Sequence, residues 1–163
     1  MYYSVKFINQ SDIEILADIE INLRDHYSNE NYLFQSMSKD EIERLWKKKK
    51  VVGVCCFPDG DISNVCGYML YEVKSASIRI CRLCINPPHF RRGAGRSMID
   101  CIKSKIYSPP VKFFHVTVVV DESMTDFHKF LVACGFKATT VVWGGIDSRP
   151  YRRDAFRFVF RND

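Results

Sequence analysis

The segment 91–96, with the sequence RRGAGR, constrains this chain more than any other. It follows an apolar run at 78–85 and precedes apolar residues at helical spacing, at 98, 99, 102 and 106. A strand, a turn with two glycines and a helix can hold an anion, because backbone N–H groups at a helix N-terminus point at it and the helix dipole favours negative charge there. Glycine also lets the backbone approach a ligand where a Cβ would collide. The segment therefore predicts a site for a phosphate-bearing ligand.

The composition is that of an ordinary globular protein, and we expect one domain, residues 1–163. Hydrophobic residues make up 47% and charged residues 26% of the chain, which is not the composition of a disordered protein. No apolar run approaches the roughly 20 residues of a membrane span. The segment 1–8 is too short, and too polar afterwards, for a signal peptide. We expect it to form a strand, and the protein to be cytoplasmic with no membrane partner.

The seven cysteines are expected to be buried free thiols. Most lie inside apolar runs, where a thiol behaves as a small hydrophobe, and nothing indicates export to an oxidising compartment. Cys81 and Cys84 have C-x-x-C spacing, but residues three apart on a strand face opposite sides of a sheet. We therefore expect no metal site.

The net charge of +5 is mild, and its densest cluster is the lysine run 47–50. Such a cluster is found in proteins that bind nucleic acid or anionic membranes. We favour the alternative, that these lysines form the solvated end of a helix, where cations suit the dipole. The aromatic residues do not interleave with these lysines as a stacking surface requires, so we expect no nucleic-acid partner.

The predicted element order is β-α-α-β-β-β-α-β-α-β-β, a mixed α/β fold with a largely antiparallel central sheet flanked by helices. Capping-box spacing at 11–14 and 38–41 predicts two helix starts. The prolines at 109–110 and Gly135 predict two helix ends. Strands are expected at 3–8, 51–57, 65–73, 77–85, 111–120, 136–143 and 155–160, with a loop at 144–153.

Two motifs make the chain similar to the GCN5-related N-acetyltransferase (GNAT) superfamily. Residues 83–87 (LCINP) and 90–96 (FRRGAGR) resemble its L-x-V-x-P and Q/R-x-x-G-x-G/A motifs, and the order of elements also matches. Phe90 departs from the pattern, since Gln or Arg is usual there. The resemblance implies that backbone amides hold a pyrophosphate at this turn, so Phe90 is expected to be tolerated.

The resemblance implies acetyl-CoA as the donor cosubstrate. Its pantetheine arm would pair with the backbone at Leu83, Cys84 and Ile85 like an added strand. We expect the strand to splay at 86–87, because proline cannot continue a ladder. The residues implied to hold the pyrophosphate are Arg91, Arg92, Gly93, Ala94, Gly95, Arg96 and Ser97.

The C-terminal half resembles one branch of the superfamily. Residues 121–128 (DESMTDFH), followed by GF at 135–136, are similar to its N-x-x-A-x-x-x-Y…G-F segment, and 153–158 (RDAFRF) resemble the close of ribosomal-protein alanine N-acetyltransferases. This implies acetyl transfer to a protein or peptide N-terminal amine. A small amine (a polyamine, amino acid or antibiotic) is the second interpretation, and a non-catalytic acyl-CoA-binding module is the third. A monomer or a homodimer fits each.

The implied reaction is attack of a neutral amine on the thioester. An α-amino group has a pKa of about 8, so a weak base or a water chain suffices. His115, a titratable group in a very apolar strand, is the candidate base. His128 is the candidate acid for the leaving thiolate, and Tyr151 is expected to cover the substrate. Each has a structural alternative: a hydrogen-bonded core or strand-end histidine for His115, a solvent-facing helix residue for His128 and a packed aromatic for Tyr151.

Several positions stay open because the alignment is loose. The superfamily's base falls at Val116 when counted from Asp121, or at Val119 when counted back from Gly135. Its tyrosine acid falls at His128 or Leu131 by the same two counts. Further candidates for substrate contact are Tyr27, Tyr32, Tyr71 and Glu72.

Overall fold

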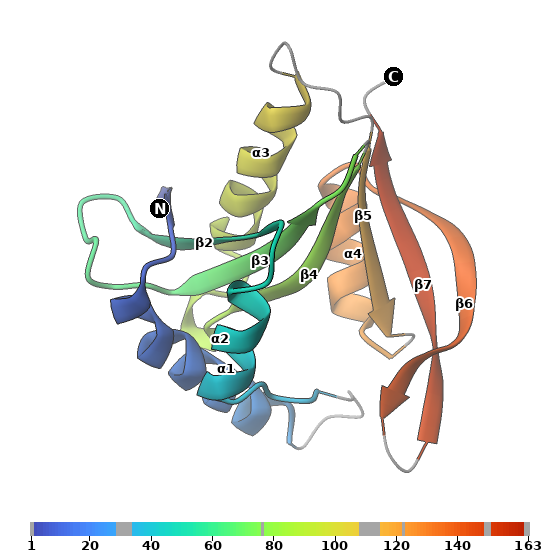
Figure 1. The fold of residues 1–163 in the computed structure, drawn as a ribbon, viewed down its shortest axis with the longest axis horizontal. Coiled ribbons are helices and arrows are strands. Elements are labelled where there is room, and N and C mark those ends of the chain that lie inside the picture. The colour runs from blue at the N-terminus through green and yellow to red at the C-terminus, as the bar shows by residue number, and fades with distance from the viewer. Residues whose placement is uncertain are drawn as a thin grey trace.

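A seven-stranded sheet in the order β1-β2-β3-β4-β5-β7-β6 carries helices on both faces (Figure 1). The computed structural model describes residues 2–28, 34–75, 77–107, 115–121, 123–148 and 151–161, without the side chains of 106–107, 143–148 and 151–154. The elements are β1 (Tyr3–Phe7), α1 (Ile13–Tyr27), α2 (Lys39–Trp46), β2 (Val51–Pro58), β3 (Gly67–Val73), β4 (Ser77–Ile85), α3 (Ala94–Tyr107), β5 (His115–Asp121), α4 (Thr125–Ala133), β6 (Lys137–Ser148) and β7 (Tyr151–Arg161).

This order confirms the mixed α/β prediction. Strand pairs are antiparallel except for β4 and β5, which run parallel. Of the predicted strand 111–120, residues 111–114 lie outside the described residues. In the described ranges, no helix is long and apolar enough to cross a bilayer.

The two predicted capping boxes have different outcomes. Ser38 Oγ accepts from the Glu41 N–H at 3.2 Å and starts α2, as predicted. At the first helix, Asn9 rather than Ser11 is the cap: its side chain accepts from the Ser11 N–H at 3.0 Å, and its own N–H donates to Asp12 at 2.9 Å. The box lies two residues earlier because a short 3-10 turn, Gln10–Asp12, precedes α1.

The sheet separates two cores. Helices α1 and α2 cover one face through Leu16, Ile19 and Ile42. Helices α3 and α4 cover the other through residues such as Met98 and Leu131. Figure 1 shows the pairs on opposite sides of the sheet. Alternation along β5 follows from this: Val116, Val118 and Val120 are buried in the second core, as period-two side-chain geometry requires.

Strands β4 and β5 separate earlier than predicted. Their ladder ends at Ile80 and Val118, not at 86–87. On the other side of β4, Leu70 pairs with Arg82 and Tyr71 with Ile80, so Cys81 is an extra residue in a β-bulge. A bulge bends its strand and increases its twist. The bulge, rather than the proline, therefore coincides with the parting of β4 from β5, which lie together at one end and apart at the other in Figure 1.

The last two strands are longer than predicted. Residues 144–153 were expected to form a loop, but β6 continues to Ser148 and β7 begins at Tyr151. Gly144 and Gly145 stand at the start of that predicted loop. Instead they lie where the register shifts between Val142 and Ile146, so an irregularity in β6 accommodates them without ending the strand.

Candidate active site

The turn before α3 has the backbone that its glycines predict. Gly93 has φ +97° and Arg91 has φ 60°, the left-handed region that glycine adopts readily and other residues rarely do. A Cβ at Gly93 would meet no atom within 4 Å, so open space lies beside it. The N–H groups in the first turn of a helix have no acceptor within the helix. Open space beside such a terminus suits an anionic group.

A cavity of about 630 Å³ opens at this helix terminus. The end of β4 and the start of α3 meet the C-terminal end of α1 and the N-terminal half of α4 around it. Its cationic end has Arg91 and Arg96, and its walls are largely apolar. Of the residues predicted to hold acetyl-CoA, those that line it are Leu83, Cys84, Ile85, Arg91, Gly93, Ala94, Gly95 and Arg96.

Two residues that were predicted to hold acetyl-CoA, Ser97 and Arg92, do not line this cavity. Ser97 Oγ donates to the Ala94 carbonyl at 2.6 Å, inside the helix. Arg92 is not among the lining residues of the described cavity. It lies near His89, whose pKa is lowered by burial and by the charge of Arg92. The Nδ1 atom of His89 is 2.9 Å from Tyr3 Oη, which ties the turn to β1.

Gly95 is needed for packing. A Cβ there would lie 2.9 Å from Cζ of Phe130 in α4. Arg96 lies against the same helix, because its Nη2 donates to the Ala133 carbonyl at 2.9 Å. These contacts place α4 against the start of α3 and form one wall of the cavity.

Phe90, the departure from the motif, belongs to an aromatic wall on the α1 side. Its ring centroid is 5.1 Å from that of His26, nearly perpendicular, and 6.5 Å from that of Tyr27. Tyr27 is in turn 5.7 Å from Phe34. All four side chains line the cavity. Phe90 therefore supplies apolar surface where Gln or Arg would supply a hydrogen-bond donor.

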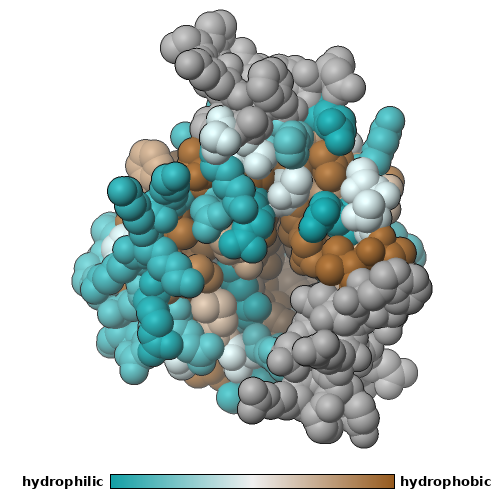
Figure 2. All heavy atoms as spheres, turned by 45° about the vertical axis from the view of Figure 1, so that its right-hand side comes forward, coloured by the Kyte–Doolittle hydropathy of each residue, from teal (hydrophilic) through white to brown (hydrophobic). Residues whose placement is uncertain are grey.

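A second cavity, of about 200 Å³, lies between β4 and β5 beyond the end of their ladder. It shares Phe34, Leu83, Cys84, Met124 and Phe127 with the first, so the two adjoin. This side of the molecule is hollowed, and hydrophobic residues form part of the edge of the hollow beside hydrophilic ones (Figure 2). Asp121, at the end of β5, brings a carboxylate to the second cavity. Its Oδ1 accepts from the Ser123 N–H at 2.8 Å.

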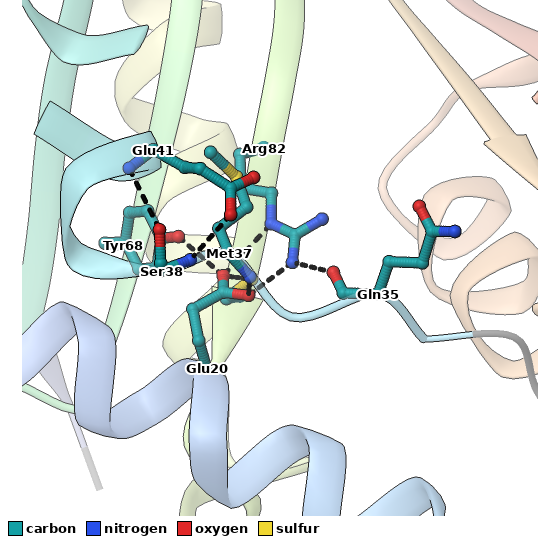
Figure 3. Close-up of polar contacts among 8 residues, drawn as sticks. Glu20, Gln35, Met37, Ser38, Glu41, Tyr68 and Arg82 are labelled. Atoms are coloured by element: carbon teal, nitrogen blue, oxygen red, sulfur yellow. Dashed lines mark hydrogen bonds and ion pairs between the residues drawn. The ribbon is translucent and has the colours of Figure 1, made fainter. Parts of the chain in front are cut away.

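A buried carboxylate, Glu20 of α1, lies beneath this region (Figure 3). Tyr68 Oη donates to it at 2.6 Å, Arg82 Nε at 3.0 Å and the Met37 N–H at 2.9 Å. Arg82 Nη2 also pairs with it. Burial alone would raise the pKa of Glu20, but the hydrogen bonds and charge of Arg82, helped by Tyr68 and Cys84, hold that pKa below its usual value. Glu20 is therefore ionised at neutral pH.

Cys84 also faces Glu20, with its Sγ 3.0 Å from Oε2. Burial raises the pKa of this thiol, so it stays protonated and is a poor nucleophile. The sulfur of Cys81 instead lies 3.7 Å from the Arg79 carbonyl. In the described ranges, no cluster of side chains has the composition of a metal site.

The structure does not bring the two candidate histidines to either cavity. His115 starts β5 and pairs with Ser77, at the closed end of the β4–β5 ladder. The His128 ring packs 5.4 Å from Phe156 and 5.2 Å from Phe158, and its Nε2 is 2.9 Å from the Asp121 carbonyl. His115 therefore lies at a strand end, and His128 faces β7 rather than solvent.

The tyrosine candidates are divided. Tyr27 lines the first cavity. Tyr71 is buried in the core that α3 and α4 cover, and this burial raises its pKa to about 12. Tyr151 lies in β7 rather than in a loop, and its side chain is outside the described residues, as is all of Tyr32. Glu72 pairs with Arg79 at 3.6 Å.

Several residues of the site were not predicted from the sequence, although the pattern around Glu20 indicates that this residue is buried. Glu20 follows Leu16 by four residues and precedes Leu23 by three, so it lies on the apolar stripe of α1. A charged residue on such a stripe predicts a buried partner. Nothing in the sequence marks the other cavity residues, His26, Phe34, Met124, Phe127 and Phe130, as a common wall.

Three solved N-acetyltransferase structures share the whole architecture. The ribosomal-protein-S18-alanine N-acetyltransferase of Escherichia coli is 12% identical over 98% of this chain and 94% of its own, with a TM-score of 0.75. NAA60 of Arabidopsis thaliana, in complex with a bisubstrate analogue, is 16% identical over 98% of both chains, with a TM-score of 0.76. A spermidine N-acetyltransferase chimera from Vibrio cholerae and hSSAT is 15% identical over 99% of this chain and 96% of its own, with a TM-score of 0.75.

The chain has the GNAT acetyltransferase fold. No protein-family model matches its sequence, and no curated protein does. The GNAT resemblance that two short motifs predicted is thus confirmed at the level of fold. Because GNAT structures named for a ribosomal protein and for spermidine match equally well, the fold does not select the acceptor.

Proposed function

We propose that this chain, as one catalytic domain, transfers an acetyl group from acetyl-CoA to a primary amine. The observation that carries the proposal is the pair of adjoining cavities at the point where β4 leaves β5. One runs from the α3 N-terminus along the end of β4, and the other continues between the strands. NAA60 of the same fold has been solved in complex with acetyl-CoA, which supports this donor.

The donor fits the first cavity by its chemistry. The pyrophosphate would lie at Gly93 and the first turn of α3, with Arg91 and Arg96 beside it. The uncharged pantetheine arm would follow Leu83 to Ile85, whose edge is free of β5. Phe90 and Phe130 offer the arm apolar surface. Its thioester would then reach the residues that both cavities share.

Transfer requires little from the protein at the reacting atoms. The amine nitrogen attacks the thioester carbonyl, the C–S bond breaks, and the CoA thiolate leaves while the amine loses a proton. A backbone N–H of β4 near Ile85 would stabilise the oxyanion. Asp121, the carboxylate on the second cavity, is our candidate to take the amine proton directly or through water.

The acceptor we propose is a protein or peptide N-terminal amine. Two of the matching structures, the S18-alanine enzyme and the NAA60 complex, support it by name and by their fit over nearly the whole chain. The charges of the described cavity residues also support this acceptor, because they balance. Arg91 and Arg96 are matched by Asp121 and Asp126, and Arg82 neutralises Glu20. A polycationic acceptor would need excess negative charge, which this lining does not offer.

The discriminating experiment is acetyl-CoA turnover across an acceptor panel. Peptides with a free N-terminal amine should release CoA, whereas the same peptides with a blocked N-terminus should not. A small amine such as spermidine is the second candidate, since a spermidine acetyltransferase chimera matches equally well. Faster turnover with spermidine than with every free peptide would select that candidate. Acetyl-CoA binding without turnover on any acceptor would favour a binding module.

A further inference from the structure

The Glu20–Arg82 pair joins three separate parts of the chain (Figure 3). Glu20 comes from α1 and Arg82 from β4, one residue after the Cys81 bulge. Their third partner is the segment 34–37, between α1 and α2. Arg82 Nη2 donates to the Gln35 carbonyl at 2.9 Å, and Glu20 accepts from the Met37 N–H at 2.9 Å. The pair thus binds this segment through its backbone at two points.

The same segment forms part of the second cavity. Phe34 and Gln35 line it opposite β5, and Phe34 also lines the first cavity. The guanidinium carbon of Arg82 lies 5.2 Å from the centroid of the Phe34 ring, a cation–π distance. Arg82 therefore contacts the ring as well as the backbone of the wall that faces an acceptor.

These contacts require both Glu20 and Arg82, and they require the planar guanidinium group of arginine. Arg82 directs Nε and Nη2 at Glu20 and shares Nη2 with Gln35. Lysine keeps the charge but cannot present donors in this arrangement. Glu20 is fully buried and takes donors from four residues, Tyr68, Arg82, Met37 and Cys84. Such a satisfied network specifies one arrangement of the parts that it joins.

We propose that Arg82 and Glu20 are positioning residues that hold the wall 34–37 in place and so set the affinity for the acceptor amine. This inference rests on the proposed transferase function. Neither residue takes part in bond making. Among the residues of the first cavity they contact Phe34 and Cys84, but not the α3 N-terminus, where the donor phosphates would lie. Donor affinity should therefore depend on them much less than acceptor affinity does.

Steady-state kinetics on Arg82→Lys, Arg82→Met and Glu20→Gln test the proposal, with Arg79→Met as the matched control. Arg79 is on the same strand and pairs with Glu72 at an exposed site. For the Arg82 and Glu20 variants we expect the acceptor KM to rise about tenfold or more, while kcat and the acetyl-CoA KM change by about twofold at most. Arg82→Lys should lie between wild type and Arg82→Met. The control should match wild type.

Two measurements without turnover accompany the kinetics. Amide hydrogen exchange of the free protein should be faster at 34–38 in Arg82→Lys than in wild type, while the acetyl-CoA Kd from calorimetry stays unchanged. These readings keep the test informative if Arg82→Met does not fold. An unchanged acceptor KM in Arg82→Lys and Glu20→Gln, or an equal rise in both KM values, would overturn the inference alone. A wild-type chain that acetylates no amine would overturn the proposed function and this inference with it.

Discussion

Ile80 of β4 pairs with Val118 of β5, and the ladder between the two strands ends at that pair. Beyond it, β4 continues to pair with β3 as far as Ile85, so only its β5-facing edge is unpaired. A backbone edge of this kind is a template for an extended ligand. Both cavities lie along it, and the proposed chemistry depends on it.

The first prediction concerns the turn before α3. Gly93→Val should weaken acetyl-CoA binding at least about tenfold, because a branched side chain enters the open space where the phosphates would lie and forces the left-handed backbone to shift. Isothermal calorimetry measures the effect. The matched control is Gly60→Val, since Gly60 also has a positive φ, of +82°, with nothing within 4 Å of its Cβ, but lies in a turn away from the cavities. Equal donor affinity in both variants would contradict this assignment.

The second prediction concerns the proton of the amine. Asp121→Asn retains an oxygen for the Ser123 N–H but removes the carboxylate charge from the second cavity. We expect kcat to fall about 10²-fold, as for a lost general base, with the acetyl-CoA KM unchanged. Steady-state kinetics at a saturating concentration of peptide measure the effect. A wild-type kcat in Asp121→Asn would contradict the role of Asp121 as the base and would indicate that water alone takes the proton.

The third prediction concerns the histidines. Because neither His115 nor His128 lines a cavity, alanine at either position should leave kcat within about threefold of wild type. His128→Ala should lower the melting temperature, since it removes a ring packed against Phe156 and Phe158. Thermal unfolding and kinetics on the same samples separate the two effects. A large kcat loss in a stably folded variant would restore a catalytic role.

The fourth prediction concerns stability and pH. Glu20 has a folded-state pKa below its ordinary value of 4.5. Its ionised form therefore stabilises the fold at pH above 4.5, and this contribution is lost as pH falls through the lowered folded value. Glu20→Gln should cost about 3–5 kcal/mol at pH 7, because Arg82, whose side chain is only 22% exposed, loses its charged partner. The variant should also lose less stability than wild type as the pH falls. Urea unfolding from pH 7 to 3 measures both.

Glu72→Gln is the control for that experiment. Glu72 forms exposed ion pairs with Lys74 and Arg79, which contribute at most about 1 kcal/mol. The free energy of unfolding of Glu72→Gln should fall between pH 7 and pH 3 as it does in wild type. If Glu20→Gln behaves in the same way, the buried pair does not stabilise the fold as we describe.

The sequence predicts local features well and the meeting of distant ones poorly. The glycine turn, the Ser38 cap and the strand–helix order follow from short-range rules, and the structure agrees. The bulge at Cys81 was missed because it depends on register with β3, which no local pattern reports. His115 was proposed for its chemistry, but its place at the closed end of β5 follows from pairing alone. Glu20 was overlooked although its position on an apolar stripe marked it.

The most direct test of the central claim is mass spectrometry of a free peptide incubated with isotopically labelled acetyl-CoA. We predict that wild-type protein adds one labelled acetyl group at the peptide α-amine, that Gly60→Val does the same, and that Gly93→Val does so at least about tenfold more slowly at a subsaturating acetyl-CoA concentration. Labelled acetyl-CoA that binds to the wild-type chain but leaves the α-amine of every peptide unmodified would contradict the account.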